Sequence, residues 1–238
     1  MLAMTLPSEI ETGPSRRPDQ PPAGAHMLDR HIRAAASRVL QAREHVFFEG
    51  DPIHHVYQIV KGTVCLYMTL PDGRRQIVDF AHAGDFIGLG ESGEHSIAAQ
   101  ASTLTKLRCL PAGALHEVAR HDPQVGVQLY RALSDQLAAA RNLLLTVGRR
   151  SATERLATLL LALSRRNERM GADPARISLP MSRAEIADFL SLTIETVSRS
   201  FTKLRQSGTI DLIQSTLVLI RDRRALEQLC ADEPAAGR

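Results

Sequence analysis

The sequence predicts an α+β chain with a strand-rich first half, one long central helix and a helix-rich second half. Three patterns in the 238 residues predict it. Short apolar runs separated by turn residues occupy positions 44–110. Apolar residues recur at three- and four-residue steps from 123 to 149, and shorter helical segments follow between 150 and 230. The 44% hydrophobic content is enough for the cores of one or two domains.

The first half contains six strand-like runs with glycine- and aspartate-rich turns between them. Turn chemistry is clearest at Gly50-Asp51-Pro52, Pro71-Asp72-Gly73 and Gly84-Asp85. The runs are EHVFFEG, HHVYQIVKG, TVCLYMTL, RRQIVDFA, SIAAQA and TLTKLRCL. Many short strands joined by such turns favour a small β-barrel or jelly roll.

A short helix is expected over 111–122, and Pro123 then begins a long one. Its apolar stripe has a nearly heptad spacing and runs for about seven turns. A compact barrel cannot cover a stripe of that length, so we expect it to form a dimer interface. A helix packed only on its own barrel is the alternative. Gly148 to Arg150 are expected to form a hinge after it. The predicted dimer positions are Leu129, Leu133, Leu137, Ala140, Leu144 and Val147.

Residues 183–202, RAEIADFLSLTIETVSRSFT, predict a helix-turn-helix. Ser182 to Glu185 form a capping box before the first helix, and Thr193 is a good N-cap for the second. Many such turns carry glycine in a left-handed conformation where this chain has Ser191, which predicts local strain. The flanking segments predict a capped helix from 151, a short strand at 177–180, a β-hairpin wing and a terminal helix at 222–230. The wing strands are expected at 209–213 and 216–220, joined at Gln214-Ser215.

The segment MSRAEIADFLSLTIETVSRSFTKLRQSG resembles the DNA-binding end of the Crp/Fnr superfamily of bacterial transcription regulators. Its ET-SR portion is most similar to the FixK branch, and the resemblance extends from about residue 28 to 230. It implies a cyclic-nucleotide-binding-like β-roll at 28–122, a dimerisation helix at 123–149 and a winged helix-turn-helix domain at 150–238. Residues 1–27 contain acidic residues, several prolines and no continuous apolar core, which predicts a disordered tail.

The outer face of the second helix offers groups that read DNA. Arg199 can donate to guanine, Glu195 can accept from cytosine, Ile194 can touch a thymine methyl, and Ser198 can contact a base or phosphate. Expected phosphate contacts are Ser182, Arg183, Thr193, Thr196 and Thr202. The resemblance implies a palindrome with TTGA-like and TCAA-like half-sites. Residues 150–238 carry 14 Lys and Arg against 11 Asp and Glu, so the net charge of +3 lies in this half.

The same resemblance implies a cyclic-nucleotide pocket, but the residues argue against its use. His95 stands where the nucleotide-binding relatives have the arginine that holds the phosphate, and Glu91 and Glu94 lie nearby. A neutral imidazole is a poor partner for a phosphodiester anion. We therefore expect no bound cofactor. An effector-gated regulator of the same fold remains an alternative.

The cysteines give no metal or disulfide pattern. Cys65 and Cys109 lie in strand-like runs and are expected to be buried, whereas Cys230 is expected to be accessible. The fumarate–nitrate regulator has an N-terminal cysteine cluster that binds iron and sulfur, and residues 1–64 here contain no cysteine. His54, His55, His82 and His95 have no ligand repeat and are expected to be surface or turn residues. A redox-sensing regulator is the second alternative.

The sequence shows no enzyme motif, no secretory signal and no run approaching 18 apolar residues. Together with the apolar stripe at 123–149 and the family resemblance, these features predict a cytoplasmic, non-enzymatic homodimer without a membrane or metal partner. Its expected partners are double-stranded DNA, a second copy of itself and RNA polymerase. The resemblance implies an activator of oxygen-responsive, respiratory or nitrogen-metabolism genes.

Overall fold

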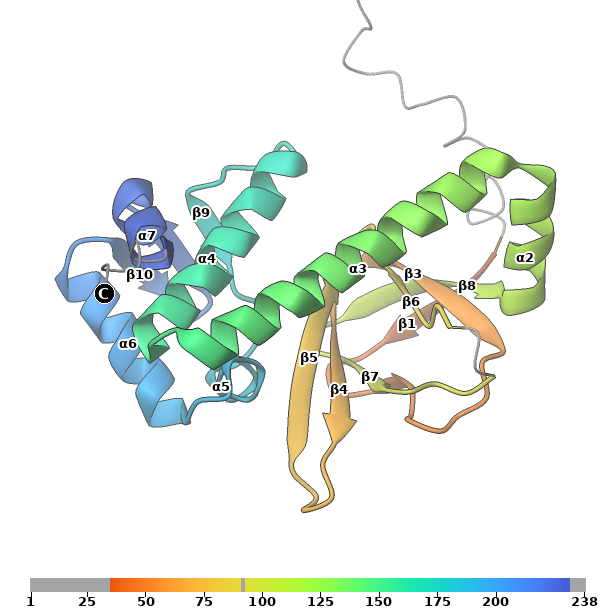
Figure 1. Ribbon diagram of the computed structural model, residues 1–238, viewed down its shortest axis with the longest axis horizontal. Coiled ribbons are helices and arrows are strands. Elements are labelled where there is room, and N and C mark those ends of the chain that lie inside the picture. The colour runs from red at the N-terminus through yellow and green to blue at the C-terminus, as the bar shows by residue number, and fades with distance from the viewer. Residues whose placement is uncertain (1–34, 91–92, 232–238) are drawn as a thin grey trace, which may run out of the picture.

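The computed structural model describes residues 35–90 and 93–231. The predicted tail at 1–27 and Glu91 lie outside these ranges. A β-roll and a smaller helical domain lie at opposite ends of one long helix, α3, as Figure 1 shows. This arrangement confirms the α+β class.

The β-roll consists of two four-stranded antiparallel sheets. One has the order β1-β8-β3-β6 and the other β2-β7-β4-β5. Inward side chains of both sheets meet in one core that includes Leu40, Ile59, Leu66, Ala99 and Leu107. The strands are β1 Ala36–Leu40, β2 His45–Phe47, β3 His55–Lys61, β4 Thr63–Thr69, β5 Arg75–His82, β6 Phe86–Ile87, β7 Ala98–Ala101 and β8 Thr105–Pro111.

Strand β4 has both faces covered, which explains why its sequence does not alternate between apolar and polar residues. Val64 and Leu66 point into the core between the two sheets. Cys65 and Tyr67, on the other face, join the core of the helical domain. The outer face of this sheet is therefore a contact surface between the two halves of the chain.

Helix α2 (Ala112–His121) leads into α3 (Pro123–Arg149). The Asp122 carboxylate caps α3 by accepting from the backbone N–H of Gln124 at 2.9 Å, and Pro123 occupies the first turn. Near this end Val125 is fully buried against Val56 and Leu110 of the β-roll. The start of α3 is thus anchored on its own domain.

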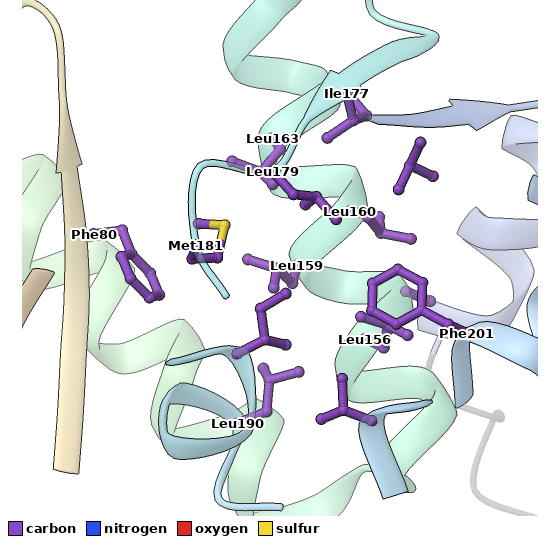
Figure 2. Close-up of a cluster of buried hydrophobic side chains, with 14 of the residues drawn as sticks. Phe80, Leu156, Leu159, Leu160, Leu163, Ile177, Leu179, Met181, Leu190 and Phe201 are labelled. Carbon is purple, nitrogen blue, oxygen red and sulfur yellow. The ribbon is translucent and has the colours of Figure 1, made fainter. Parts of the chain in front are cut away.

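The second half folds around one apolar cluster, part of which is drawn in Figure 2. Leu156, Leu160, Leu190 and Phe201 lie at its centre, and Phe80 reaches it from β5. The sheet order is β10-β11-β9. The elements are α4 Ala152–Arg169, β9 Arg176–Ser178, α5 Arg183–Leu190, α6 Ile194–Gln206, β10 Ile210–Gln214, β11 Leu217–Ile220 and α7 Arg223–Cys230.

The structure differs from the sequence predictions at the end of α3, at the turn of the wing and at two short strands. Helix α3 continues through Gly148, so the helical break lies at Arg150, the C-cap, and not across the predicted three-residue hinge. The wing turns at Ser215-Thr216, because Gln214 still pairs with Leu217. Strands β1 and β6 were not predicted.

Candidate nucleic-acid interface

Helix α5 begins with the predicted capping box. The Ser182 hydroxyl accepts from the backbone N–H of Glu185 at 3.2 Å, and the Glu185 carboxylate accepts from the N–H of Ser182 at 2.7 Å. Ile186, Ala187 and Leu190 of this helix are buried. The capping bonds satisfy two of the four unpaired N–H groups at this end of the helix. Those that remain can donate to a phosphate.

The turn between α5 and α6 depends on Ser191. Its backbone is left-handed, with φ 53° and ψ 51°, and its neighbour Leu192 donates from its N–H to the carbonyl of Ala187 at 2.9 Å. A non-glycine residue in this conformation costs about 1 kcal/mol. The turn thus keeps its usual geometry and bears the predicted strain.

Helix α6 presents the four predicted base-reading residues on one exposed face: Ile194, Glu195, Ser198 and Arg199. Ile194 is 49% exposed although it is apolar. The opposite face buries Val197, Phe201 and Leu204. The Ser198 hydroxyl donates to the carbonyl of Ile194 at 2.9 Å. That hydroxyl can still accept a hydrogen bond from a base or solvent.

Glu195 and Arg199 lie one turn apart. The pKa of the Glu195 carboxyl is lowered by its own backbone N–H, by the Thr193 hydroxyl and, less strongly, by the charge of Arg199. The carboxylate is thus turned toward the start of its helix. In the described part of the chain the exposed Arg199 guanidinium makes no ion pair, so its planar group of donors can face a nucleic acid base.

The predicted phosphate contacts have different environments. Ser182, Thr193 and Thr202 are exposed and Thr196 is partly buried. Thr193 caps α6 by accepting from the N–H of Thr196 at 3.2 Å, and the Thr202 hydroxyl donates to the carbonyl of Ser198 at 3.0 Å.

Arg183 is held in place instead of extending into solvent. Its guanidinium lies 3.4 Å from the centre of the Phe201 ring, and burial lowers its pKa. It also makes a long contact of 3.5 Å with the carbonyl of Ser215 in the wing. Arg183 therefore joins the start of α5 to the wing turn, so any phosphate contact that it makes has to occur at this site.

The middle of α3 exposes an apolar stripe. Leu133 is 47% exposed, Leu137 52% and Leu144 75%, and Ala140 between them is also exposed. The two ends of the predicted set differ, because Leu129 packs partly on the Val56 and Leu110 cluster and Val147 is partly buried. Tyr130, which is 72% exposed, and Val127, which is 42% exposed, extend the exposed apolar surface toward the start of α3.

The β-roll has a small cavity where a cyclic nucleotide pocket was considered. It measures about 90 Å³ and is lined by Phe47, Ile87, Glu94, His95 and Gln136 among others. His95 is buried and stacks on Phe47 with 3.6 Å between ring centres, and burial lowers its pKa. The expectation of a surface or turn position for His95 was wrong. It failed because sequence alone did not show that Phe47 would stack on the ring.

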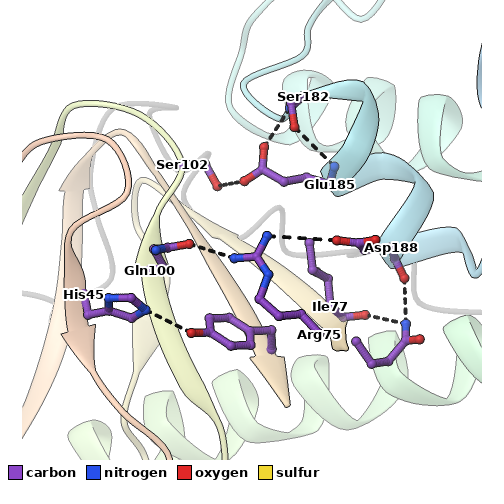
Figure 3. Close-up of polar contacts among 10 residues, drawn as sticks. His45, Arg75, Ile77, Gln100, Ser102, Ser182, Glu185 and Asp188 are labelled. Atoms are coloured by element: carbon purple, nitrogen blue, oxygen red, sulfur yellow. Dashed lines mark hydrogen bonds and ion pairs between the residues drawn. The ribbon is translucent and has the colours of Figure 1, made fainter. Parts of the chain in front are cut away.

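A polar seam joins the β-roll to α5, and sequence reasoning missed it (Figure 3). The Ser102 hydroxyl donates to Glu185 at 3.0 Å, and the Gln76 side chain donates to the carbonyl of Asp188 at 2.7 Å. Arg75 lies 3.9 Å from the Asp188 carboxylate. These contacts connect residues about 80 to 110 positions apart. The signal that could have revealed them was the uninterrupted apolar run TVCLYMTL, which predicts a strand covered on both faces.

A second contact lies at the other end of β5. Arg166 of α4 makes an ion pair with Asp85 at 3.1 Å and donates to the carbonyl of Ala83 at 2.8 Å. Phe80 and Phe189 also meet edge to face, with 5.3 Å between ring centres. The orientation of the helical domain on the β-roll is thus fixed by both apolar and charged contacts.

The cysteines have no accessible reactive thiol pair. Cys65 is buried, and burial raises its pKa to about 12; burial also raises the pKa of Cys109. Cys230 was predicted to be accessible, but it is partly buried, with its sulfur 3.4 Å from the Thr158 hydroxyl. Within residues 35–90 and 93–231 no group of three or more His, Cys, Asp or Glu side chains could hold a metal ion. None of the helices described is both long and apolar enough to cross a membrane.

Two family models match the two halves of the chain. The Crp-like helix-turn-helix domain matches residues 154–229, and the cyclic nucleotide-binding domain matches residues 37–122. The first match contains α5 and α6, and the second contains the β-roll.

Individual relatives span most of the chain. The nitrogen fixation regulation protein FixK of Bradyrhizobium diazoefficiens is 40% identical over 191 residues, which cover 79% of each protein. The fumarate and nitrate reduction regulatory protein of Escherichia coli K12 is 31% identical and covers 80% of this chain and 76% of its own length. The structure of FixK2 from Bradyrhizobium japonicum superposes with a TM-score of 0.78 at 36% identity, over 84% of this chain and 99% of that one.

The helix-turn-helix match contains the exposed helix α6, and the relatives that match the chain are named as transcription regulators. The chain belongs to the FixK branch of the Crp/Fnr superfamily of DNA-binding transcription regulators.

Proposed function

We propose that two copies of this chain pair through α3 and bind a palindrome with TTGA-like and TCAA-like half-sites, without a bound effector. The observation that carries the proposal is the exposed face of α6. It places Glu195 and Arg199 one turn apart on a helix whose opposite side is fully packed. A packed helix whose Arg199 guanidinium has no ion pair among the described residues is suited to the major groove.

The stripe on α3 supports the homodimer. Leu133, Leu137 and Leu144 expose large apolar side chains on one face of the same helix. Apolar residues at such spacing are typical of helices that pair with a second helix. A twofold dimer puts two α6 helices about one turn of DNA apart, which a palindrome matches.

The β-roll cavity supports activity without a ligand. Its volume of about 90 Å³ is well below the roughly 300–1,000 Å³ typical of small-molecule sites. His95 fills the space beside Phe47, and the backbone of His95 is bonded in both directions to the turn at Gly50 and Asp51, at 2.8 Å each. A nucleotide would have to displace a packed ring and bring its phosphate close to Glu94.

The wider role follows from the relatives. They are named as regulators of nitrogen fixation and of fumarate and nitrate reduction. We propose that this chain activates oxygen-responsive respiratory or nitrogen-metabolism genes by recruiting RNA polymerase to such a palindrome.

Base substitution combined with Arg199→Ala tests the reading helix. The variant should lose roughly 1–3 kcal/mol of specific binding and accept other bases in place of the contacted guanine. Fluorescence anisotropy measures the Kd of the wild-type protein and of the Arg199→Ala variant on DNAs that carry each of the four bases at that position.

Glu195→Ala is the companion variant. It should relax selectivity at the neighbouring cytosine and leave overall affinity nearly unchanged, since removal of a negative charge also eases the approach to phosphates.

If Arg199→Ala keeps the base discrimination of the wild type at every position, α6 does not read bases through Arg199.

A further inference from the structure

Three helices meet at the side chain of Arg155. Its Nη2 donates to the carbonyl of Val147 at 2.7 Å and its Nε donates to the carbonyl of Arg150 at 2.9 Å. Its Nη1 donates to the carbonyl of Leu190 at 2.9 Å, with Ser191 at 3.3 Å. We call Arg155 and these four carbonyls the Arg155 cluster. It joins the first turn of α4 to the ends of α3 and α5, which lie side by side in Figure 1.

All four acceptors lie at helix ends, where carbonyls have no partner within the helix. Val147 and Arg150 belong to the end of α3, and Leu190 and Ser191 to the end of α5. Such ends carry partial negative charge, and a guanidinium offers five donors in a fixed plane. One permanently charged group therefore binds two helix ends at a defined angle. A lysine ammonium could not reproduce that planar geometry.

The cluster also holds the strained turn of the helix-turn-helix. Ser191 has a left-handed backbone, and its carbonyl and that of Leu190 both point at Arg155. The direction in which α6 leaves this turn depends on these two peptide groups. The guanidinium thus acts on the reading helix without being near its exposed face.

We propose that Arg155 is a positioning residue that sets the angle between the pairing helix α3 and the reading helix α6, and hence the half-site spacing that the dimer accepts. The proposal rests on the proposed function, because spacing has meaning only for a dimer on a palindrome. The only covalent link between α3 and α4 is the short segment at Arg150 and Ser151. Without the cluster, the angle at that segment depends on the contacts between the helical domain and the β-roll alone.

Other contacts allow Arg155 variants to fold. The Arg166–Asp85 ion pair and the Gln76 contact with α5 do not involve the Arg155 cluster, and the apolar core of the helical domain remains complete. The test therefore uses Arg155→Lys, which keeps the charge, and Arg155→Gln, which removes it. Arg165→Gln, an exposed arginine of the same helix, is the matched control.

The experiment measures Kd by anisotropy for full-length protein on four DNAs: a single half-site, the best palindrome, and palindromes with one base pair added or removed at the centre. Sedimentation and thermal unfolding are recorded for each variant. We expect both Arg155 variants to stay dimeric and to bind the single half-site as wild type does. Their preference for the best spacing should fall about tenfold, which corresponds to about 1.4 kcal/mol. Arg165→Gln should behave as wild type.

The possible outcomes distinguish a failure of the proposed palindrome binding from a failure of the positioning role of Arg155. A wild-type protein that prefers no palindrome over the half-site contradicts the proposed function itself. A wild-type spacing preference that both Arg155 variants retain overturns the positioning role. So does an equal loss of affinity on all four DNAs, or unfolding of both variants, since either result shows that Arg155 only stabilises the domain.

Discussion

At the scale of single residues, Asp79 and His82 of β5 show how stability depends on pH near the Arg166–Asp85 contact. Burial raises the pKa of Asp79 to about 6 and lowers that of His82 to about 4. The folded chain binds a proton at Asp79 more readily than the unfolded chain does, so this residue costs stability as pH rises from about 4 to 6. His82 has the opposite effect on the free energy of unfolding, which it increases as pH rises, because its neutral form is favoured in the folded state. The two effects largely cancel over the same pH range.

Substitution of one of these two groups should expose the effect of the other on the pH dependence of stability. Asp79→Asn should leave His82 uncompensated, so the free energy of unfolding should fall by up to about 3 kcal/mol between pH 6.5 and 4. His82→Gln should show the reverse slope, with stability decreasing as pH rises from 4 to 6. Urea unfolding at half-unit pH steps measures both. Parallel pH profiles for the two variants and wild type would show that neither group titrates as described.

At the scale of elements, periodic segments were the easiest to predict. Helix α3 and the α5–α6 pair follow regular apolar steps over many residues, and the structure places all three as predicted. Strand β1 was missed because four of its five residues are exposed, so Ala36–Leu40 carries no alternating pattern. Strand β6 has two residues and depends on its pairing with β3. Both strands are specified by neighbours distant in sequence.

The pairing role of α3 gives a prediction for the element. Leu137→Glu should break the dimer and abolish palindrome binding, since two like charges would be brought together near the twofold axis. Asn142→Glu is the matched control, because position 142 is exposed and lies about 140° around the helix from Leu137. Equilibrium sedimentation decides the outcome. Dimers of equal strength in both variants would place the interface elsewhere.

At the scale of the whole molecule, contacts between the two halves could not be read from the sequence. The reading face of α6 was predicted because its pattern is local. Ser102, Gln76 and Arg166 were not predicted, because each has its partner more than 80 positions away. Arg155 was missed for a related reason, since its acceptors are backbone carbonyls that leave no trace in the sequence.

These contacts should contribute to stability. Arg166→Met keeps most of the side-chain stem and removes the ion pair with Asp85 and the bond to Ala83. We expect a loss of about 1–3 kcal/mol in the free energy of unfolding, since the Ala83 carbonyl and the Asp85 carboxylate lose a charged partner in a partly buried site. Arg165→Met, on the exposed side of α4, should change it by less than about 0.5 kcal/mol. Denaturant unfolding compares the two variants. Equal changes in the free energy of unfolding would show that the contacts of Arg166 with Asp85 and Ala83 do not contribute to stability.

The central claim is that the dimer reads a palindrome without an effector. The most direct measurement is a salt-titrated gel shift of purified protein on a TTGA–TCAA palindrome and on a scrambled duplex, with and without millimolar cyclic AMP. We expect at least about a thousandfold preference for the palindrome, a Kd that weakens as salt increases, and no change on adding nucleotide. Equal binding to the scrambled duplex, or a tenfold gain with cyclic AMP, which requires about 1.4 kcal/mol of coupling, would contradict it.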